Sequence, residues 1–301
     1  MRLPEKALPV FSWLCGLILM TAIGCVIGFL FFKGWRSLHL PLVFGTTPPW
    51  DAILLRRRVF DGLFPAMAGT FLLVCLAVGW AVPAGIGAGI YLAEYAGGKT
   101  RTFLNLIFDL LAGLPSIVIG LFGFSITVYL NHHLSARIYP CLLISSVALA
   151  FLVLPYTIRA TQTALESQPA SLRMTAPALG AGRLQNIIHV LLPQSLSGIM
   201  SGVILATGRC AEDTAVIMLT GAVATAGLPQ SVFSGYEALP FYIYYISSQY
   251  TGPEELATGY GAAIILLVIC LMLFSLAFFI QKKVRHATQG RNDPIPAGAR
   301  S

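Results

Sequence analysis

The sequence predicts an all-α membrane protein with about six transmembrane helices, and three observations lead to this prediction. Hydrophobic residues fill 56% of the 301 positions and charged residues only 10%, whereas a soluble domain carries about 25% charged residues. The mean hydropathy is +0.79. Six apolar runs reach the roughly 20 residues that a helix needs to cross a hydrocarbon core of about 30 Å. These observations exclude a soluble globular protein.

The six apolar runs give the expected spans in order. We expect them at Phe11–Phe32, Leu63–Ala93, Leu104–Leu130, Cys141–Thr163, Ser195–Ala222 and Leu256–Ile280. The first run is as long as a full span and lacks a convincing small-residue cleavage site, so it is expected to be a retained anchor and not a signal peptide. The expected organisation is therefore an anchor helix with an external loop (residues 1–62), a helical core (63–281) and a cytoplasmic disordered tail (282–301).

Prolines and glycines inside the runs predict that the helices pack together. Three prolines lie inside or at the ends of spans: Pro83, Pro115 and Pro155. Such breakers are tolerated in lipid only when neighbouring helices cover the freed backbone groups. Gly85 with Gly89, and Gly198 with Gly202, are pairs at fourfold spacing that permit close helix approach.

Residues Thr225–Gly252 are only partly apolar and are rich in aromatic side chains, with Pro240 near the centre. Tyrosine is favoured at the membrane interface, which suits an interfacial or extracellular helix. A re-entrant segment that lines a pathway is the alternative.

A polar stretch from Arg159 to Pro193 interrupts the apolar pattern. Small residues surround Gly180, and Val190-Leu191-Leu192-Pro193 follows after nine intervening residues. Gly permits unusual backbone angles and Pro ends helices, so the spacing predicts two short amphipathic helices, joined by a tight bend at Gly180 and closed by Pro193. Residues 164–193 are expected to form a soluble cytoplasmic loop.

Charges inside the spans are a second signal. Arg209 lies about 22 Å along the fifth expected span, where a charge costs at least about 2.5 to 3.5 kcal/mol. Glu212 and Asp213 follow at three and four residues, so both can pair with it. The arginine either fixes helix packing through these pairs or faces a substrate. Arg159 follows Leu154-Pro155-Tyr156, and it either meets an anion leaving the pathway or extends its charge to the headgroups.

Charged residues also predict the topology. The formal net charge of +7 is spread over span ends, which favours membrane orientation over nucleic-acid binding. Residues 223–255 contain no Lys or Arg and three glutamates, so both termini are expected in the cytoplasm. Arg56-Arg57-Arg58 falls outside in this scheme and is expected in an interfacial helix. The basic residues expected inside are Arg2, Lys6, Lys99, Arg101, Arg159, Arg173, Arg183, Lys282, Lys283, Arg285, Arg291 and Arg300.

No pattern predicts catalysis or a metal site. The six cysteines lie singly in apolar runs without CxxC spacing, so they are expected to be small buried hydrophobic residues. The pair His132-His133 is expected on a solvated loop. Ala93–Thr100 matches a relaxed phosphate-loop pattern, but it ends a span where a strand and a nucleotide-binding core are required, so no nucleotide is expected there.

Four motifs resemble one family. The stretch around Gly180, ending at Pro193, is similar to the coupling loop of binding-protein-dependent ABC importer permeases, which reads Glu-Ala-Ala, three residues, Gly, nine residues, Ile-x-Leu-Pro. Leu111–Gly123, Gly85–Tyr95 and Leu154-Pro155-Tyr156 with Arg159 resemble the phosphate-specific permeases of the PstA type. The resemblance covers residues 64–280 in consistent order.

The resemblance implies a MetI-like ABC importer permease fold and a permease subunit for ATP-driven phosphate import in the bacterial inner membrane. It implies as partners a homologous permease of the PstC type, two ATPase subunits of the PstB type that use ATP and Mg, and a periplasmic phosphate-binding protein of the PstS type. The chain itself is expected to bind no cofactor or metal and to be no enzyme. The implied substrate-pathway residues are Arg209, Arg159, Asp213 and Glu212. The implied ATPase-coupling residues are Ser171, Arg173, Met174, Ala176, Ala178, Gly180, Ala181 and Pro193.

The sequence departs from the family at two places. Met174-Thr175-Ala176 replaces Glu-Ala-Ala, so any salt bridge from that glutamate to the ATPase is missing. Glu212 stands where the family usually has glycine, and Asp213 takes the place of its acid. A related oxyanion therefore stays open as the substrate. A stand-alone secondary transporter driven by an ion gradient is the rival class, although it gives the loop no purpose, and no group of side chains favours a membrane enzyme.

Overall fold

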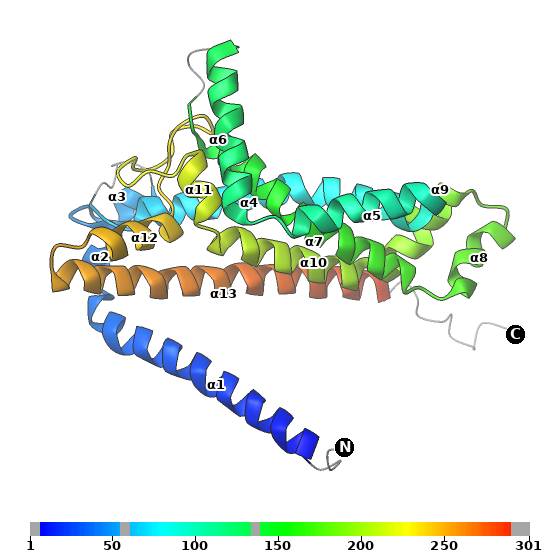
Figure 1. The fold of residues 1–301 in the computed structure, drawn as a ribbon, viewed down its shortest axis with the longest axis horizontal. Coiled ribbons are helices and arrows are strands. Elements are labelled where there is room, and N and C mark those ends of the chain that lie inside the picture. The colour runs from blue at the N-terminus through cyan, green and yellow to red at the C-terminus, as the bar shows by residue number, and fades with distance from the viewer. Residues whose placement is uncertain (1–6, 55–60, 134–138, 290–301) are drawn as a thin grey trace, which may run out of the picture.

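The computed structural model of the chain describes residues 7–54, 61–133 and 139–289, and these form a bundle of helices (Figure 1). The segment Arg56-Arg57-Arg58, expected in an interfacial helix, lies outside the described residues. The long helices are α1 (Ala7–Gly34), α4 (Phe64–Ile90), α5 (Gly98–Ala112), α6 (Ser116–His133), α7 (Leu142–Glu166), α10 (Leu192–Glu212) and α13 (Pro253–Gln289). The short elements are η1 (Trp35–Ser37), α2 (Leu40–Phe44), α3 (Pro49–Ile53), η2 (Tyr91–Tyr95), α8 (Ala170–Ala178), α9 (Arg183–Asn186), η3 (Ile187–Leu191), α11 (Ala215–Thr220) and α12 (Leu239–Gln249).

Five helical segments of the described chain are long and apolar enough to cross a membrane, and a bent helix pair adds a sixth candidate. They are Leu8–Ser37, Phe64–Tyr95, Leu142–Glu166, Arg183–Glu212, Pro253–Lys283 and the pair Gly98–Ala112 with Ser116–His133. The prediction of about six spans is confirmed. The third expected span, over Leu104–Leu130, falls on this bent pair, in which α5 and α6 meet at 96°. Pro115 lacks an N–H and cannot continue the helix behind it, and Gly113 adds freedom at the same turn.

The central helix is α7, which packs against α4 on one side and α10 on the other. Glycines make both contacts close. A Cβ on Gly85 would lie 1.9 Å from Thr157 Oγ1, and a Cβ on Gly202 would lie 2.2 Å from Ala160 Cβ. The predicted role of the paired glycines in close packing is confirmed. Pro83 and Pro155 lie inside α4 and α7 without ending them.

The fifth span differs from its prediction at both ends. Its helix starts at Arg183 and runs through Pro193, so Pro193 does not close a second short helix as expected. The π-helical turn η3 leads directly into α10, of which Pro193 is the second residue. The turn changes the hydrogen-bond register just before the proline, so the helix continues although Pro193 lacks an N–H. The helix ends at Glu212 and not at Ala222, because Asp213 has extended backbone and its Oδ1 accepts the Val216 N–H at 2.9 Å, which starts α11.

The two ends of the bundle carry different elements. One end holds α8, α9 and the last turns of α13; the other holds α2, α3, α12 and the start of α13 (Figure 1). The aromatic segment Thr225–Gly252 lies at the second end. It forms a loop followed by α12, whose 11 residues are too few to span a membrane. Leu239 begins α12 and donates its N–H to Thr70 Oγ1 of α4 at 2.9 Å.

The C-terminal helix corrects a further expectation. The helix α13 continues to Gln289, so residues 282–289 of the expected disordered tail are helical. This stretch lacks Gly and Pro until Gly290, which explains the extension. The first helix, α1, diverges from the bundle (Figure 1), and its span window has no buried residue.

The cysteines are only partly as expected. Cys141 and Cys210 are buried and Cys270 is half-buried, but Cys15, Cys25 and Cys75 are exposed, so the prediction of burial is wrong for these three. They lie on helix faces that the rest of the chain does not cover. All six are free thiols.

Candidate functional site

Arg159 of α7 is bound entirely by neighbouring side chains and backbone. Its Nε and Nη2 both donate to Asp109 Oδ1. Nη1 donates to Asn105 Oδ1 at 2.9 Å and to Gln162 Oε1 at 3.0 Å, and Nη2 donates to the Asn105 carbonyl at 3.0 Å. A guanidinium has five N–H groups, so these five bonds use its full donor capacity.

The polar contacts continue along the seam between α5 and α7. Gln162 Nε2 donates to Glu166 Oε1 at 2.8 Å, and Arg101 at the start of α5 forms an ion pair with the same carboxylate. The helix α5 has no buried residue among those described, so directional polar contacts carry much of its attachment to α7.

A groove of about 550 Å³ opens beside Arg159. It is lined by Ala112, Pro155, Tyr156, Arg159, Ala160, Thr163, Gly198, Ser201, Gly202 and Leu205. The groove lies between α7 and α10, together with Ala112 of α5, and Arg159 is the charged residue in its lining.

Arg209 lies in the last turn of α10, where a cation also suits the helix dipole. Its Nη1 contacts Glu212 Oε1 at 3.1 Å and its Nη2 lies 3.6 Å from Asp213 Oδ2. The predicted pairing of Arg209 with both acids is confirmed. Unlike Arg159, this guanidinium keeps donor capacity: its Nε is buried without a hydrogen-bond partner.

The two carboxylates beside Arg209 differ in exposure. The Asp213 side chain is only 3% exposed and also caps α11, whereas the Glu212 side chain is 62% exposed. Asp213 is therefore a buried partner that both pairs with Arg209 and holds the start of α11. Glu212 pairs with Arg209 on the exposed side. Arg209 was predicted to lie in the middle of the fifth span. The helix ends at Glu212, so Arg209 lies near the end of the span instead.

Sequence reasoning missed the partners of Arg159. Asp109, Asn105 and Gln162 are absent from the residues predicted for the substrate pathway. A signal existed in part, because Asn105 and Asp109 are four residues apart and share one face of α5. Their partner lies 50 residues or more away in the sequence, which no local pattern reveals.

The expected cytoplasmic loop is shorter than predicted, because residues 164–166 belong to α7 and the next long helix begins at Arg183. We call residues 167–191, with α8, α9 and η3, the coupling segment. Gly180 forms its bend with φ of +82°, as expected. Leu179 at the bend is 85% exposed and Met174 on α8 is 65% exposed.

The predicted coupling residues divide by exposure. Those on the outer surface are Ser171, Met174, Ala178 and Gly180, whereas Ala176, Ala181 and Pro193 are half-buried. Arg173 points into the bundle and pairs with Glu94 of η2. The exposed Leu179 and Leu184 were not singled out from the sequence.

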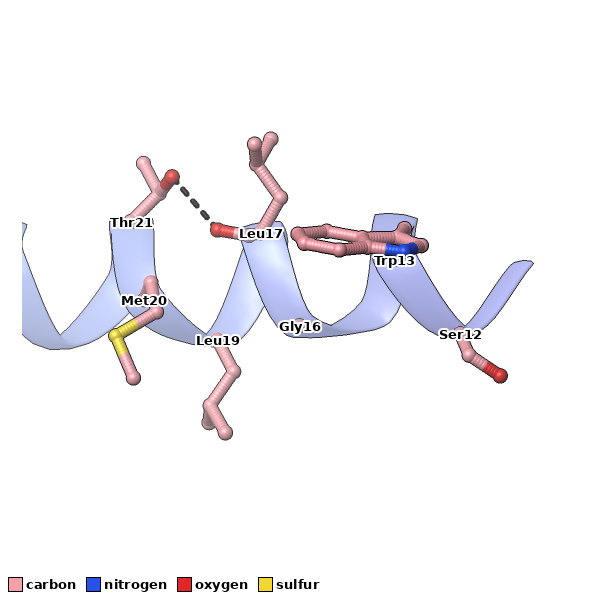
Figure 2. A pocket seen from close by; sticks show the side chains of 7 residues that line it. All are labelled: Ser12, Trp13, Gly16, Leu17, Leu19, Met20 and Thr21. Atoms are coloured by element: carbon pink, nitrogen blue, oxygen red, sulfur yellow. Dashed lines mark hydrogen bonds between the residues drawn. The ribbon is translucent and has the colours of Figure 1, made fainter. Parts of the chain in front are cut away.

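A separate hollow lies on α1 and is formed by that helix alone. Figure 2 shows its lining side chains around Gly16, with Thr21 Oγ1 donating to the Leu17 carbonyl at 2.8 Å. The lining contains no charged residue, so this hollow offers nothing to hold an anion. Within the described ranges no group of three or more His, Cys, Asp or Glu side chains is arranged for a metal ion.

Comparison with known families agrees with this arrangement. Residues 85–286 match the family described as binding-protein-dependent transport system inner membrane component. The chain belongs to this family. As a member, it is a multi-pass inner-membrane permease component and not a catalyst, and the matched range contains both Arg159 and Arg209 and the whole coupling segment.

The chain is also similar to a curated relative and to two solved structures. The phosphate transport system permease protein PstA of Haemophilus influenzae is 34% identical over 276 residues, which cover 90% of this chain and 89% of the relative. A bacterial alginate ABC transporter, solved with an alginate-bound periplasmic protein, aligns with a TM-score of 0.62 at 17% identity, covering 94% and 98% of the two chains. The MetNI methionine ABC transporter aligns at 0.52 with 19% identity, covering 81% and 99%. The MetI-like permease fold is thereby confirmed.

Proposed function

We propose that the chain is the PstA-type permease subunit of an ATP-driven importer of inorganic phosphate. The observation that carries the proposal is Arg209 with its unpartnered, buried Nε, at a helix break, in a chain 34% identical to a phosphate transport permease over 90% of its length. A phosphate dianion cannot cross lipid bare, so cationic and hydrogen-bonding groups must replace part of its hydration.

Arg209 suits transient binding of such an anion. The two carboxylates beside it exceed its single positive charge, which weakens its hold on an anion, and a transport pathway needs sites that bind weakly enough to release the ion. Arg159 meets an anion only by giving up bonds to Asp109 or Asn105, because all its N–H groups are engaged. Arg209 is therefore the first contact in the proposed pathway and Arg159 a later one.

The proposed complex contains a homologous permease of the PstC type, two ATPase subunits of the PstB type and a phosphate-binding protein of the PstS type. The exposed Leu179 and Met174 would dock on an ATPase subunit, which uses ATP and Mg. Both termini would lie in the cytoplasm together with the coupling segment. When the ATPases close on ATP, the coupling segment moves and the spans rock from inward-facing to outward-facing.

The experiment is phosphate uptake by vesicles that contain the assembled complex and the loaded binding protein. We expect uptake to require ATP and all subunits, with excess sulfate or molybdate having little effect. Uptake by this chain alone under an ion gradient would establish the secondary-transport alternative. Complete displacement of phosphate by sulfate or molybdate would assign a different oxyanion.

An Arg209→Ala complex tests the pathway residue. Losing hydrogen bonds to a charged group costs about 1.5 to 3 kcal/mol, so uptake should fall at least about tenfold while the complex still assembles. Arg209→Lys should retain part of the rate, because it keeps the charge without the planar donor set. Normal uptake by Arg209→Ala would make the arginine structural. Glu212→Gln is the comparison, because it changes the exposed partner of Arg209. We expect it to lower uptake less than Arg209→Ala does.

A further inference from the structure

Glu94 is a buried carboxylate that the proposed pathway does not use. It lies in η2, the π-helical turn that ends the span of α4, and the residue is 8% exposed. It belongs to the stretch Ala93–Thr100 that imitates a phosphate loop in the sequence. Its Oε1 accepts a hydrogen bond from Nη1 of Arg173 on α8. The stretch therefore contacts the coupling segment instead of a nucleotide.

The neighbouring residue makes a second contact with the same segment. The guanidinium carbon of Arg183 lies 4.9 Å from the centroid of the Tyr95 ring, within the range of a cation–π interaction. Tyr91 stacks on Tyr95 with centroids 6.4 Å apart and rings 10° from parallel, which supports the ring. Two consecutive residues of η2 thus hold α8 and α9, on the two sides of the bend at Gly180.

Arg173 joins more than two elements. Its Nη2 donates to the Leu165 carbonyl of α7 at 2.7 Å, and its own carbonyl accepts the Asn186 Nδ2–H at 2.9 Å. This arginine therefore connects α4, α7, α8 and α9 through directional bonds. Removing Glu94 would leave a partly buried guanidinium with one partner fewer.

An apolar contact between segment and bundle accompanies these polar ones. Leu165, Ile187 and Leu191 form a small buried cluster, with Ile90, Ala93 and Leu172 packed against it. Apolar contacts are non-directional and tolerate sliding, whereas the Glu94–Arg173 pair and the Tyr95–Arg183 contact fix orientation. Both long helices that meet here, α4 and the helix of α10, carry a π-helical turn at this place, and such turns are frequent at functional sites.

We propose that Glu94 and Tyr95 of η2, with Arg173 and Arg183 of the coupling segment, form a clamp that transmits movement of this segment to α4. From α4 the movement passes to α7 through the close contacts at Gly85 and Gly89. Glu94 and Tyr95 are positioning residues in this inference, since neither touches the transported anion. The inference rests on the proposed function as an ATP-driven permease.

The test compares import per ATP hydrolysed in the complete reconstituted complex. Glu94→Gln removes the charge, Tyr95→Leu removes the ring, and Tyr95→Phe keeps the ring as the matched conservative variant. Glu254→Gln, the same isosteric change at the other end of the bundle, is the control. We expect assembly and ATP hydrolysis within twofold of wild type for all four. Phosphate import per ATP should fall at least fivefold in Glu94→Gln and Tyr95→Leu only.

The outcomes separate the clamp from the function on which it rests. A wild-type complex without ATP-dependent phosphate import would overturn the proposed function. A working wild type with an unchanged ratio in Glu94→Gln and Tyr95→Leu would overturn the clamp alone. Failure of both variants to assemble would also count against it, because a contact that only transmits movement does not hold the subunits together. An equal loss in Tyr95→Phe would exclude the cation–π contact.

Discussion

Asp109 accepts two of the five hydrogen bonds that Arg159 donates, and this pair fastens the surface helix α5 to the central helix α7. The attachment is polar, because α5 buries no side chain among its described residues. The bend of 96° after Ala112 frees α5 from α6. The seam with α7 therefore sets the position of α5.

This relationship predicts energetic coupling between the two residues. Arg159→Ala and Asp109→Ala should each lower stability, and the double variant should be less destabilised than the sum, by about 1 kcal/mol for a partly exposed pair. Urea unfolding of the four proteins in detergent measures the cycle. Additive effects would mean that the pair contributes nothing and that the seam depends on Asn105 and Gln162.

The packing of α4 on α7 gives a sharper prediction, because two nearby glycines have opposite surroundings. A Cβ at Gly85 would clash with Thr157 Oγ1, whereas a Cβ at Gly87 would meet nothing within 4 Å. Gly85→Ala should therefore destabilise the protein by about 1 to 3 kcal/mol through overpacking. Gly87→Ala should be neutral or slightly stabilising, since alanine favours the helix. Thermal unfolding in detergent distinguishes them, and equal effects would contradict the close contact.

The sequence predicted what depends on local spacing. Hydropathy located the spans, glycine pairs at fourfold spacing located the close contacts, and the i+3 and i+4 acids identified the partners of Arg209. The pairing with Asp213 holds even though its backbone is extended. Local spacing suffices here because the arginine and the acids are only three and four residues apart.

What the sequence did not predict depends on tertiary contacts or on hydrogen-bond register. Pro193 was expected to end a helix, but the π-helical turn η3 precedes it and the helix continues. Glu94 was considered only as part of the Ala93–Thr100 match to a phosphate loop, which was rejected. Its partner Arg173 is 79 residues away, so no local pattern indicated their ion pair. The bend at Gly113 was missed because apolar composition alone does not distinguish a straight span from a broken one.

Glu237 provides a prediction about pH. It lies outside the spans, is 5% exposed, and accepts the Gly227 N–H at 2.7 Å. Burial raises the pKa of this carboxyl, and the hydrogen bond from Gly227 offsets only part of the effect. The folded state therefore holds the proton to higher pH than the unfolded chain, whose glutamate pKa is about 4.3. Stability is lost as pH rises through the folded pKa.

Glu237→Gln removes this dependence while it keeps an acceptor for Gly227. The variant should match wild type near pH 4 and unfold a few degrees higher near pH 7. Melting temperatures across that range in detergent provide the measurement. A variant that is less stable than wild type at pH 7 would show that the ionised carboxylate stabilises the loop, contrary to the direction of its pKa.

The bend of the coupling segment gives the last prediction, again through two glycines. Gly180 has φ of +82° with open space around a Cβ, and Gly182 has φ of −70°. Any side chain at Gly180 meets backbone strain of about 1 to 2 kcal/mol, while alanine at Gly182 meets none. Strain at Gly180 would displace the adjacent Leu179, which is 85% exposed. Gly180→Ala should weaken co-purification with the ATPase subunits and Gly182→Ala should not. Gly180→Trp should abolish ATP-dependent import while membrane insertion stays normal. Equal co-purification of the two alanine variants would show that docking does not depend on the shape of this bend.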